Sequence, residues 1–270
     1  MHKLYFLIIC KYNVKPNVEK DVKFYVTFDA KFNTLTSEKL MIFTVGGIKG
    51  GSGKSTIATN LAVWLSKQAY DVLLIDADEQ QTATKFTKWR ERVTEGNSGY
   101  TATILTGDAV RQQVMKFKPK FDHIIIDTGG RDTTSQRAAL FVSDIYLVPF
   151  NPRSFDLWTI ADVENLVREV RSLKPDELHA FSILNRADPK GSDNKDSAEL
   201  LNESTVIEHI GPAIVSRKSF ANTASNGLGV IEGNPTDEKA VAEINLLFSG
   251  IMQRFNVKID VPSNVGKDAI

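Results

Sequence analysis

Short apolar runs alternate with longer amphipathic stretches from Met41 onward, and this rhythm restricts the chain to one class of fold. Five runs predict buried parallel strands, because each is continuous and ends in a polar or glycine-containing loop. They are MIFTVG (41–46), DVLLIDAD (71–78), DHIIIDTG (122–129), IYLVPF (145–150) and AFSILN (180–185). Stretches with apolar residues at helical spacing lie between them, including one at 156–173. The order predicts an α/β fold with a doubly wound, mostly parallel sheet flanked by helices, in which ligands bind at the carboxyl ends of the strands.

The chain of 270 residues is long enough for one large domain and a short appendage. Residues 1–40 break the strand–helix rhythm and predict a non-catalytic extension, whether a hairpin, a flexible segment or an upstream over-translation. Residues 41–256 are expected to form the main domain. Residues 257–270 are expected to be a loosely held tail.

Composition limits the classes of partner and cofactor. Lysine plus arginine and aspartate plus glutamate both total 33, so net charge provides no long-range attraction to nucleic acid or membrane. Cys10 is the only cysteine, which excludes an internal disulfide and a single-chain cysteine-based metal site or iron–sulfur cluster. No segment approaches the roughly 20 apolar residues that a bilayer crossing needs. We expect a cytoplasmic protein.

The segment GGSGKST (50–56) follows a predicted strand and opens a predicted helix, which is the context of a phosphate-binding loop. Its glycines allow backbone N–H groups to approach phosphate oxygens, and the helix N-terminus adds positive character. Lys54 can then reach the β- and γ-phosphates, and the Ser55 hydroxyl can bind Mg²⁺. The generic pattern has glycine at the first position of the loop, where this chain has Ile48.

With Lys49 included, KGGSGKST resembles the deviant Walker A loop of the ParA/MinD family of ATPases. The resemblance extends from Met41 to about residue 255, and it implies a P-loop NTPase fold and a ParA-like ATPase domain over 41–256. It also implies ATP and Mg²⁺ as cofactors and an ATP-dependent homodimer, in which Lys49 reaches the nucleotide held by the other subunit. The alternative for Lys49 is a solvated surface lysine.

Acidic residues follow two of the predicted strands. Asp76 and Asp78 are two positions apart and therefore lie on the same side of an extended chain near the loop. Their segment resembles the DxDxQ motif of the family, although Glu79 stands where many relatives have proline; the resemblance implies that Asp76 assists the Mg²⁺ hydration shell and Asp78 orients the attacking water. Asp127 ends an apolar strand and reads as the Walker B carboxylate for Mg²⁺. Strand-end carboxylates that cap a helix are the alternative for the pair.

Two further assignments depend on the resemblance. Asn185 corresponds to the asparagine that hydrogen-bonds adenine in the family, although a turn-forming asparagine explains the residue as well. The segment AIVSRKSFANTASNGLGVIE (213–232) resembles the segment on the DNA-facing side of the family's dimer, so Arg217 and Lys218 are the candidate DNA-binding residues. Ordinary solvated charges are the alternative for this pair.

The candidate site therefore has three overlapping parts. The catalytic candidates are Lys49, Lys54 and Asp78. The nucleotide-binding candidates are Lys49, Gly50, Gly51, Ser52, Gly53, Lys54, Ser55, Thr56 and Asn185. The metal-binding candidates are Ser55, Asp76 and Asp127.

The resemblance predicts an ATPase that dimerises with ATP, binds nucleoid DNA nonspecifically and positions a plasmid, a chromosome or a protein assembly such as a carboxysome. No arginine finger can be identified, so we expect slow intrinsic hydrolysis that a small basic ParB-like protein or cargo adaptor accelerates. Three alternatives remain. The first is a metabolic or assembly enzyme on the same core, such as an amidotransferase-like synthetase. The others are a membrane-cycling MinD-like regulator and a nucleotide-binding scaffold without turnover. Membrane attachment is disfavoured, because the apolar stripe at 239–255 is typical of core packing.

Overall fold

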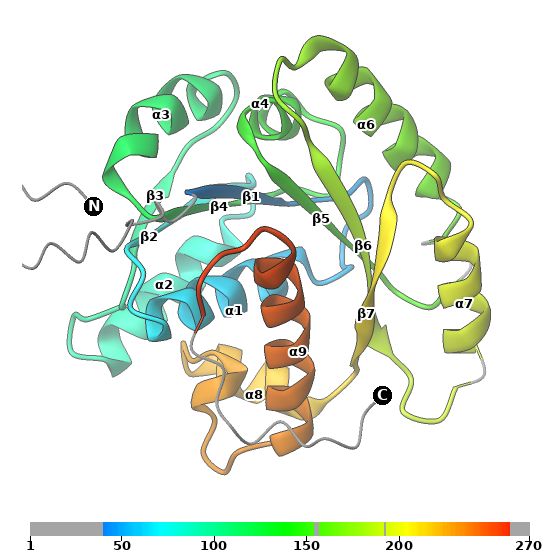
Figure 1. Ribbon diagram of the computed structural model, residues 1–270. Coiled ribbons are helices and arrows are strands. Elements are labelled where there is room, and N and C mark those ends of the chain that lie inside the picture. Colours follow the sequence, from blue (N-terminus) through cyan, green and yellow to red (C-terminus); the bar gives the residue numbers. More distant parts are fainter. Residues whose placement is uncertain (1–39, 154–156, 192, 260–270) are drawn as a thin grey trace, which may run out of the picture. The chain divides into compact units, whose positions relative to one another are not determined.

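The computed structural model describes residues 40–153, 157–191 and 193–259, all of which belong to the unit Glu38–Ile270 (Figure 1). Seven strands of this part form a single sheet in the order β3-β2-β4-β1-β5-β6-β7, and every neighbouring pair is parallel. The strands are β1 (Met41–Val45), β2 (Val72–Ala77), β3 (Thr101–Ile104), β4 (His123–Thr128), β5 (Ile145–Phe150), β6 (His179–Ala187) and β7 (Glu208–Val215). The predicted fold class and the five predicted strands are confirmed.

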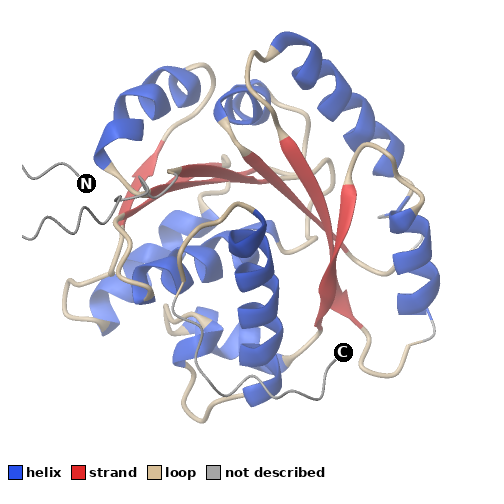
Figure 2. Ribbon diagram, in the orientation of Figure 1, coloured by secondary structure: helices blue, strands red, loops and turns tan. Residues whose placement is uncertain are grey.

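Helices cover both faces of the sheet, as Figure 2 shows. The α-helices are α1 (Lys54–Lys67), α2 (Thr82–Val93), α3 (Ala109–Phe117), α4 (Thr134–Val142), α6 (Ile160–Leu173), α7 (Asp193–Asn202), α8 (Lys218–Ser225) and α9 (Glu238–Arg254). Two short 3₁₀ helices, η1 (Lys118–Lys120) and η2 (Val230–Glu232), complete the described elements. Helices α1, α2 and α9 cover one face, and α3, α4 and α6 cover the other (Figure 1).

Alternation along the strands explains this double covering. In β4, Ile125 packs in the core with α1 and α9, whereas Ile124 and Ile126 pack in the opposite core with α3 and α4. Successive side chains of a strand point to opposite faces, so a central strand that is buried on both sides needs apolar residues at every position. The continuous apolar runs of the sequence are the direct result.

The two edge strands were not predicted from the sequence. β3 is four residues long and largely exposed, and β7 has only two buried residues, Ile210 and Ile214. An edge strand has a neighbouring strand on one side only and is less completely buried. Apolar residues are therefore not needed at every position, which explains why its sequence pattern is weak.

The predicted ends of the domain are only partly within the described residues. The expected extension at 1–40 lies outside them apart from Leu40, and so do positions 260–270 of the expected tail. Val257 is buried in the core beside α9, and the Tyr70 hydroxyl donates to the Lys258 carbonyl. The first residues of the expected tail are therefore packed against the domain.

Helix α9 confirms that the apolar stripe at 239–255 serves packing. Ile244, Leu247 and Ile251 are each at most 2% exposed. In the part of the chain that the structure describes, no helix is long and apolar enough to span a bilayer.

His123 predicts a loss of stability in mild acid. It is 1% exposed, and burial lowers its pKa to about 4 from an ordinary value of 6.5. Below pH 6.5 the His123 imidazole binds a proton in the unfolded chain but stays neutral in the folded chain. The free energy of unfolding therefore falls until the pH reaches the folded pKa. We expect a loss of about 2 kcal/mol in the free energy of unfolding between about pH 7.5 and about pH 5 from this residue.

Urea unfolding of the wild type and of His123→Phe at both pH values checks this prediction. Phenylalanine keeps an aromatic ring beside Phe43 and Tyr70, which both meet the His123 ring edge-on. The variant should lose less stability in acid than the wild type. An equal loss in the two proteins would show that His123 is not the titrating group.

Candidate functional site

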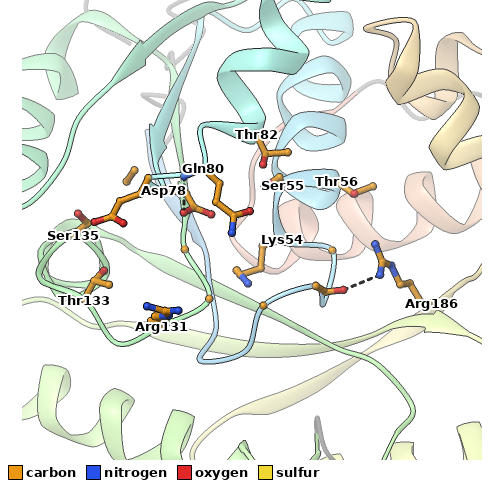
Figure 3. Close-up of a pocket in the computed structure, with 17 residues that line it drawn as sticks. Lys54, Ser55, Thr56, Asp78, Gln80, Thr82, Arg131, Thr133, Ser135 and Arg186 are labelled. Atoms are coloured by element: carbon orange, nitrogen blue, oxygen red, sulfur yellow. Dashed lines mark hydrogen bonds between the residues drawn. The ribbon is translucent and has the colours of Figure 1, made fainter.

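A cavity of about 600 Å³ opens at the carboxyl ends of the central strands, where β1, β2 and β4 run into their loops. This volume lies within the range of small-molecule sites. Figure 3 shows its walls, with Lys54 between Arg131 and Arg186. The lining residues are Gly50, Gly51, Gly53, Lys54, Ser55, Thr56, Ala77, Asp78, Glu79, Gln80, Thr82, Gly129, Gly130, Arg131, Thr133, Ser135 and Arg186. Most of the predicted loop therefore faces one cavity.

The loop between β1 and α1 has the backbone that its glycines predict. Gly51 and Gly53 have φ of 82° and 93°, in the left-handed region where a side chain is strained. Lys54 is 6% exposed, and its Nζ donates to the Lys49 carbonyl at 2.7 Å. The ammonium group is thus folded across the loop that surrounds the phosphate position. Such a loop, followed by a helix N-terminus, is an anion-binding cradle.

Two residues at the end of β6 hold this loop from outside. The Asn185 side chain donates from Nδ2 to the Ser52 carbonyl at 2.6 Å, and Arg186 donates from Nη1 to the Gly51 carbonyl at 2.8 Å. Asn185 is 4% exposed and is not among the residues that line the cavity. The structure therefore gives Asn185 a loop-holding role, and its predicted contact with adenine stays a prediction.

The three predicted carboxylates lie at the carboxyl ends of two neighbouring strands, Asp78 directly after β2. Asp76 of β2 stands opposite Asp127 of β4 in the sheet register. Asp76 is buried, and its Oδ2 and Oδ1 accept from the backbone N–H groups of Thr84 at 2.7 Å and Asp78 at 3.2 Å. Asp76 thus fastens the start of α2 to the strand end, which is the capping role that the sequence left open as an alternative.

Asp78 lines the cavity and is held in place locally. Its Oδ1 accepts from the Gln80 N–H at 3.1 Å, and a Cβ at Gly129 would lie 3.2 Å from the same oxygen. The carboxylate therefore faces the loop that follows β4. From this place it can accept a hydrogen bond from a water molecule in the cavity.

Asp127 has the environment of a cation ligand. It is fully buried, and neither carboxylate oxygen has a hydrogen bond among the described residues. Burial raises its pKa to about 8, against the opposing influence of Ser55 and Lys54. A buried carboxylate in this state gains most from a bound cation.

No cluster of three or more histidine, cysteine or acidic side chains suited to a metal occurs among the described residues. Mg²⁺ is commonly held by one or two protein ligands together with waters and phosphate oxygens, so Asp127 and the nearby Ser55 fit that ion. Asp76, whose oxygens accept backbone N–H groups, fits the predicted indirect role through the hydration shell.

Lys49 is half-buried and is not among the residues that line the cavity of its own chain. Its carbonyl accepts the Lys54 ammonium, which places its backbone at the rim of the loop. This location is compatible with a side chain that serves another molecule. The role of Lys49 across a dimer interface remains a prediction.

The candidate DNA-binding residues differ in their surroundings. Arg217 forms an ion pair with Glu243 of α9, with Nη2 and Oε1 2.6 Å apart, and its side chain is 21% exposed. Lys218 begins α8 and is exposed. The Glu243 carboxylate offsets the charge that Arg217 could offer to a phosphate, so Lys218 is the stronger candidate of the two.

Sequence reasoning missed several cavity residues. Arg131 follows the glycine pair after β4, and Arg186 follows Asn185 directly. Thr133 and Ser135 lie at the start of α4, where the Thr133 hydroxyl caps the helix by accepting from the Gln136 N–H. The glycine pair that precedes Arg131, directly after the strand that carries Asp127, was the available signal for that residue. No local pattern marks the others.

Comparisons with known proteins agree with this geometry. Residues 43–230 match the family model of the CobQ/CobB/MinD/ParA nucleotide binding domain. The chain is 24% identical over 226 residues to the maintenance of carboxysome distribution protein A of Halothiobacillus neapolitanus, with 81% of this chain and 99% of that protein covered.

Many solved structures have a similar fold, and two of them show the likeness. The ATP complex of Cyanothece McdA has a TM-score of 0.68 and 18% identity, with 83% of this chain and 99% of that chain covered. A plasmid partition protein of Borrelia burgdorferi B31, bound to AMPPNP, has a TM-score of 0.63 and 21% identity, with 80% of this chain and 100% of that chain covered.

Proposed function

The chain belongs to the CobQ/CobB/MinD/ParA family of nucleotide-binding domains, and from this premise we propose that it is an ATP-driven switch that positions intracellular cargo. It binds ATP with Mg²⁺, dimerises, associates with nucleoid DNA in the cytoplasm, and leaves the DNA when a partner stimulates hydrolysis. The cargo is a plasmid, a chromosome or a protein assembly such as a carboxysome. The partner is a small basic ParB-like protein or a cargo adaptor.

The observation that carries the proposal is a cavity lined by the phosphate loop and Asp78, with the buried Asp127 behind the lining residues and close to Ser55 and Lys54 of that loop. Lys54 and the loop N–H groups can hold the triphosphate, while Asp127 and Ser55 can hold Mg²⁺. When bound, Mg²⁺ would neutralise charge on the β- and γ-phosphates. Asp78 lines the same cavity, which supports its proposed role of orienting the attacking water. The likeness to a carboxysome distribution protein supports the cargo class.

Dimerisation is tested by measuring mass in solution with ADP, ATP and a non-hydrolysable ATP analogue. We expect a monomer of 30.0 kDa with ADP and twice that mass with ATP or the analogue. Lys49→Ala should bind ATP as a monomer, because the residue predicted to cross the interface is missing. The same mass in solution with ADP and with ATP would contradict the proposed ATP-dependent dimerisation.

DNA association is tested with Lys218→Glu and with Lys116→Glu as the matched control. Both lysines are exposed, and Lys116 lies on α3 on the opposite face of the sheet. We expect Lys218→Glu to weaken retention on nonspecific duplex DNA and to reduce the salt dependence of log Kd by about 1 per subunit. Equal binding by the two variants would remove Lys218 from the DNA surface.

A second candidate function is favoured by the family model itself, whose description also includes CobQ and CobB. A synthetase on the same nucleotide-binding core remains the alternative, and it would not need DNA. Persistent monomer with ATP, together with ATP turnover and no retention on DNA, would favour it over the switch.

A further inference from the structure

Arg131 is a cation at the nucleotide cavity that the predicted mechanism does not use. It lies in the loop between β4 and α4, and it lines the cavity together with Lys54 and Asp78 (Figure 3). Its side chain is exposed, and it comes directly after Gly129 and Gly130. The γ-phosphate end of a nucleotide held by Lys54 would lie in this part of the cavity.

The backbone on both sides of Arg131 is anchored. A Cβ at Gly130 would lie 2.5 Å from the backbone nitrogen of Gly50, so the loop after β4 packs directly on the phosphate loop. Gln136 is fully buried. In the amide orientation that satisfies both its oxygen and its nitrogen, the oxygen accepts from the Tyr146 hydroxyl. The nitrogen then donates to the Arg131 carbonyl at 2.6 Å and to the Gly47 carbonyl at 3.3 Å. The arginine side chain therefore extends from a fixed point beside the phosphate position.

Several charged groups near Arg131 are held in contacts of their own. Asp132, the next residue, accepts from Arg137 at 2.6 Å, and Arg137 also pairs with Glu169 at 2.8 Å. Arg186, the other arginine among the cavity-lining residues described, is engaged with the Gly51 carbonyl. Asp132 and the two other arginines are thus held in separate contacts, while Asp78 and Glu79 line the cavity with Arg131.

We propose that Arg131 binds the γ-phosphoryl group of the ATP in its own subunit and stabilises the charge on that group during hydrolysis. Water forms a bond to the γ-phosphorus as the bond to the bridging oxygen of ADP breaks. The electron pair of that bond leaves with ADP, and a proton of the water passes to the phosphate product or to solvent. Stabilising the charge on the transferring group is the main contribution a protein makes to this reaction.

The proposal rests on the proposed ATPase activity and adds a residue to it. It also explains how the loop after β4 would respond to hydrolysis. The loop would lose the contact between Arg131 and the γ-phosphate when phosphate leaves. The anchored Gly130 and the Gln136 bond connect that event to the phosphate loop and to α4.

The test compares Arg131→Ala and Arg131→Lys with Arg168→Ala, an exposed arginine of α6 whose i,i+4 partner is Glu164. We expect Arg131→Ala to lower kcat roughly a hundredfold, with ATP affinity changed by about threefold or less. Arg131→Lys should recover part of kcat, because it keeps the charge but loses the planar fork. Arg168→Ala should match the wild type.

A binding measurement gives a readout that does not depend on turnover. Arg131→Ala should bind ADP with aluminium fluoride, a mimic of the transferring phosphoryl group, at least about tenfold more weakly than the wild type, while its affinity for ADP alone is unchanged. Equal affinity of the wild type and the variant for the mimic would overturn the proposal. So would an unchanged kcat of Arg131→Ala.

Mixing variants separates action on the same subunit from action on a partner. Arg131→Ala mixed with Lys54→Ala should stay inactive, because no subunit then has both an intact phosphate loop and Arg131. Restored hydrolysis would place Arg131 in the partner's site and overturn the assignment to the same subunit. Failure of the proposed function itself would look different, since the wild type would then neither bind nor hydrolyse ATP.

Discussion

Asp78→Ala should lower ATP hydrolysis by about a hundredfold or more and leave the ATP-bound dimer intact. The Asp78 carboxylate lines the cavity and is oriented by the Gln80 N–H, so its loss removes the group that positions the attacking water. The phosphate loop and Asp127 are untouched, so ATP and Mg²⁺ binding should remain. Rapid-quench hydrolysis assays and mass measurement in solution check the two halves of this prediction.

Asp162→Ala is the matched control for Asp78→Ala. Asp162 is an exposed aspartate in the first turn of α6, and it is not among the residues that line the cavity. The control should hydrolyse ATP at the wild-type rate. Wild-type hydrolysis by Asp78→Ala would show that another group orients the water, and a monomer with ATP would show that Asp78 helps to assemble the dimer.

Gly53→Ala should weaken ATP binding by about a hundredfold, for two physical reasons. The residue has a φ of 93°, which disfavours any side chain, and a Cβ there would lie 2.2 Å from Nδ2 of Asn185. The added methyl group must displace Asn185 from the Ser52 carbonyl and relax the left-handed backbone. Both changes disturb the loop that holds the phosphates. Isothermal titration with ATP measures the loss.

Gly250→Ala is the control for adding a methyl group without a clash. Gly250 lies in α9, and a Cβ there would meet no atom within 4 Å. This variant should bind ATP like the wild type. Asn185→Ala should weaken binding less than Gly53→Ala, because it removes the loop anchor but leaves the backbone unstrained. Unchanged ATP affinity in Gly53→Ala would mean that the loop tolerates a different conformation.

The site residues that could be predicted are those that lie at the end of a strand or next to it in the sequence. Asp76, Asp78 and Asp127 end apolar runs, and parallel strands bring their carboxyl ends to one edge of the sheet. The phosphate loop is equally local, because its glycines, its lysine and its helix start are contiguous. The central strands were predictable for a related reason, since burial on both faces leaves a continuous apolar run.

The parts that could not be predicted depend on contacts between distant segments. Asn185 bonds to Ser52 across 133 positions of the sequence, and this contact gives it a loop-holding role that the sequence did not predict. Arg217 meets Glu243 on α9, which offsets the charge predicted for DNA. Neither partner is marked by any pattern near the residue that it engages.

The sequence by itself determined the class of fold, the phosphate loop and the strand-end acids, because strand alternation and loop chemistry are local properties of the chain. Only the tertiary structure decided which arginines line the cavity and which of them are held by other groups. Arg131, Arg137 and Arg186 are equivalent as cations in the sequence, but Arg137 is held by Asp132 and Glu169, and Arg186 by the Gly51 carbonyl. Glu169 and the Gly51 carbonyl come from other segments of the chain than the arginines that they hold. Which arginine contacts which acceptor is therefore settled only when the loops and helices pack together.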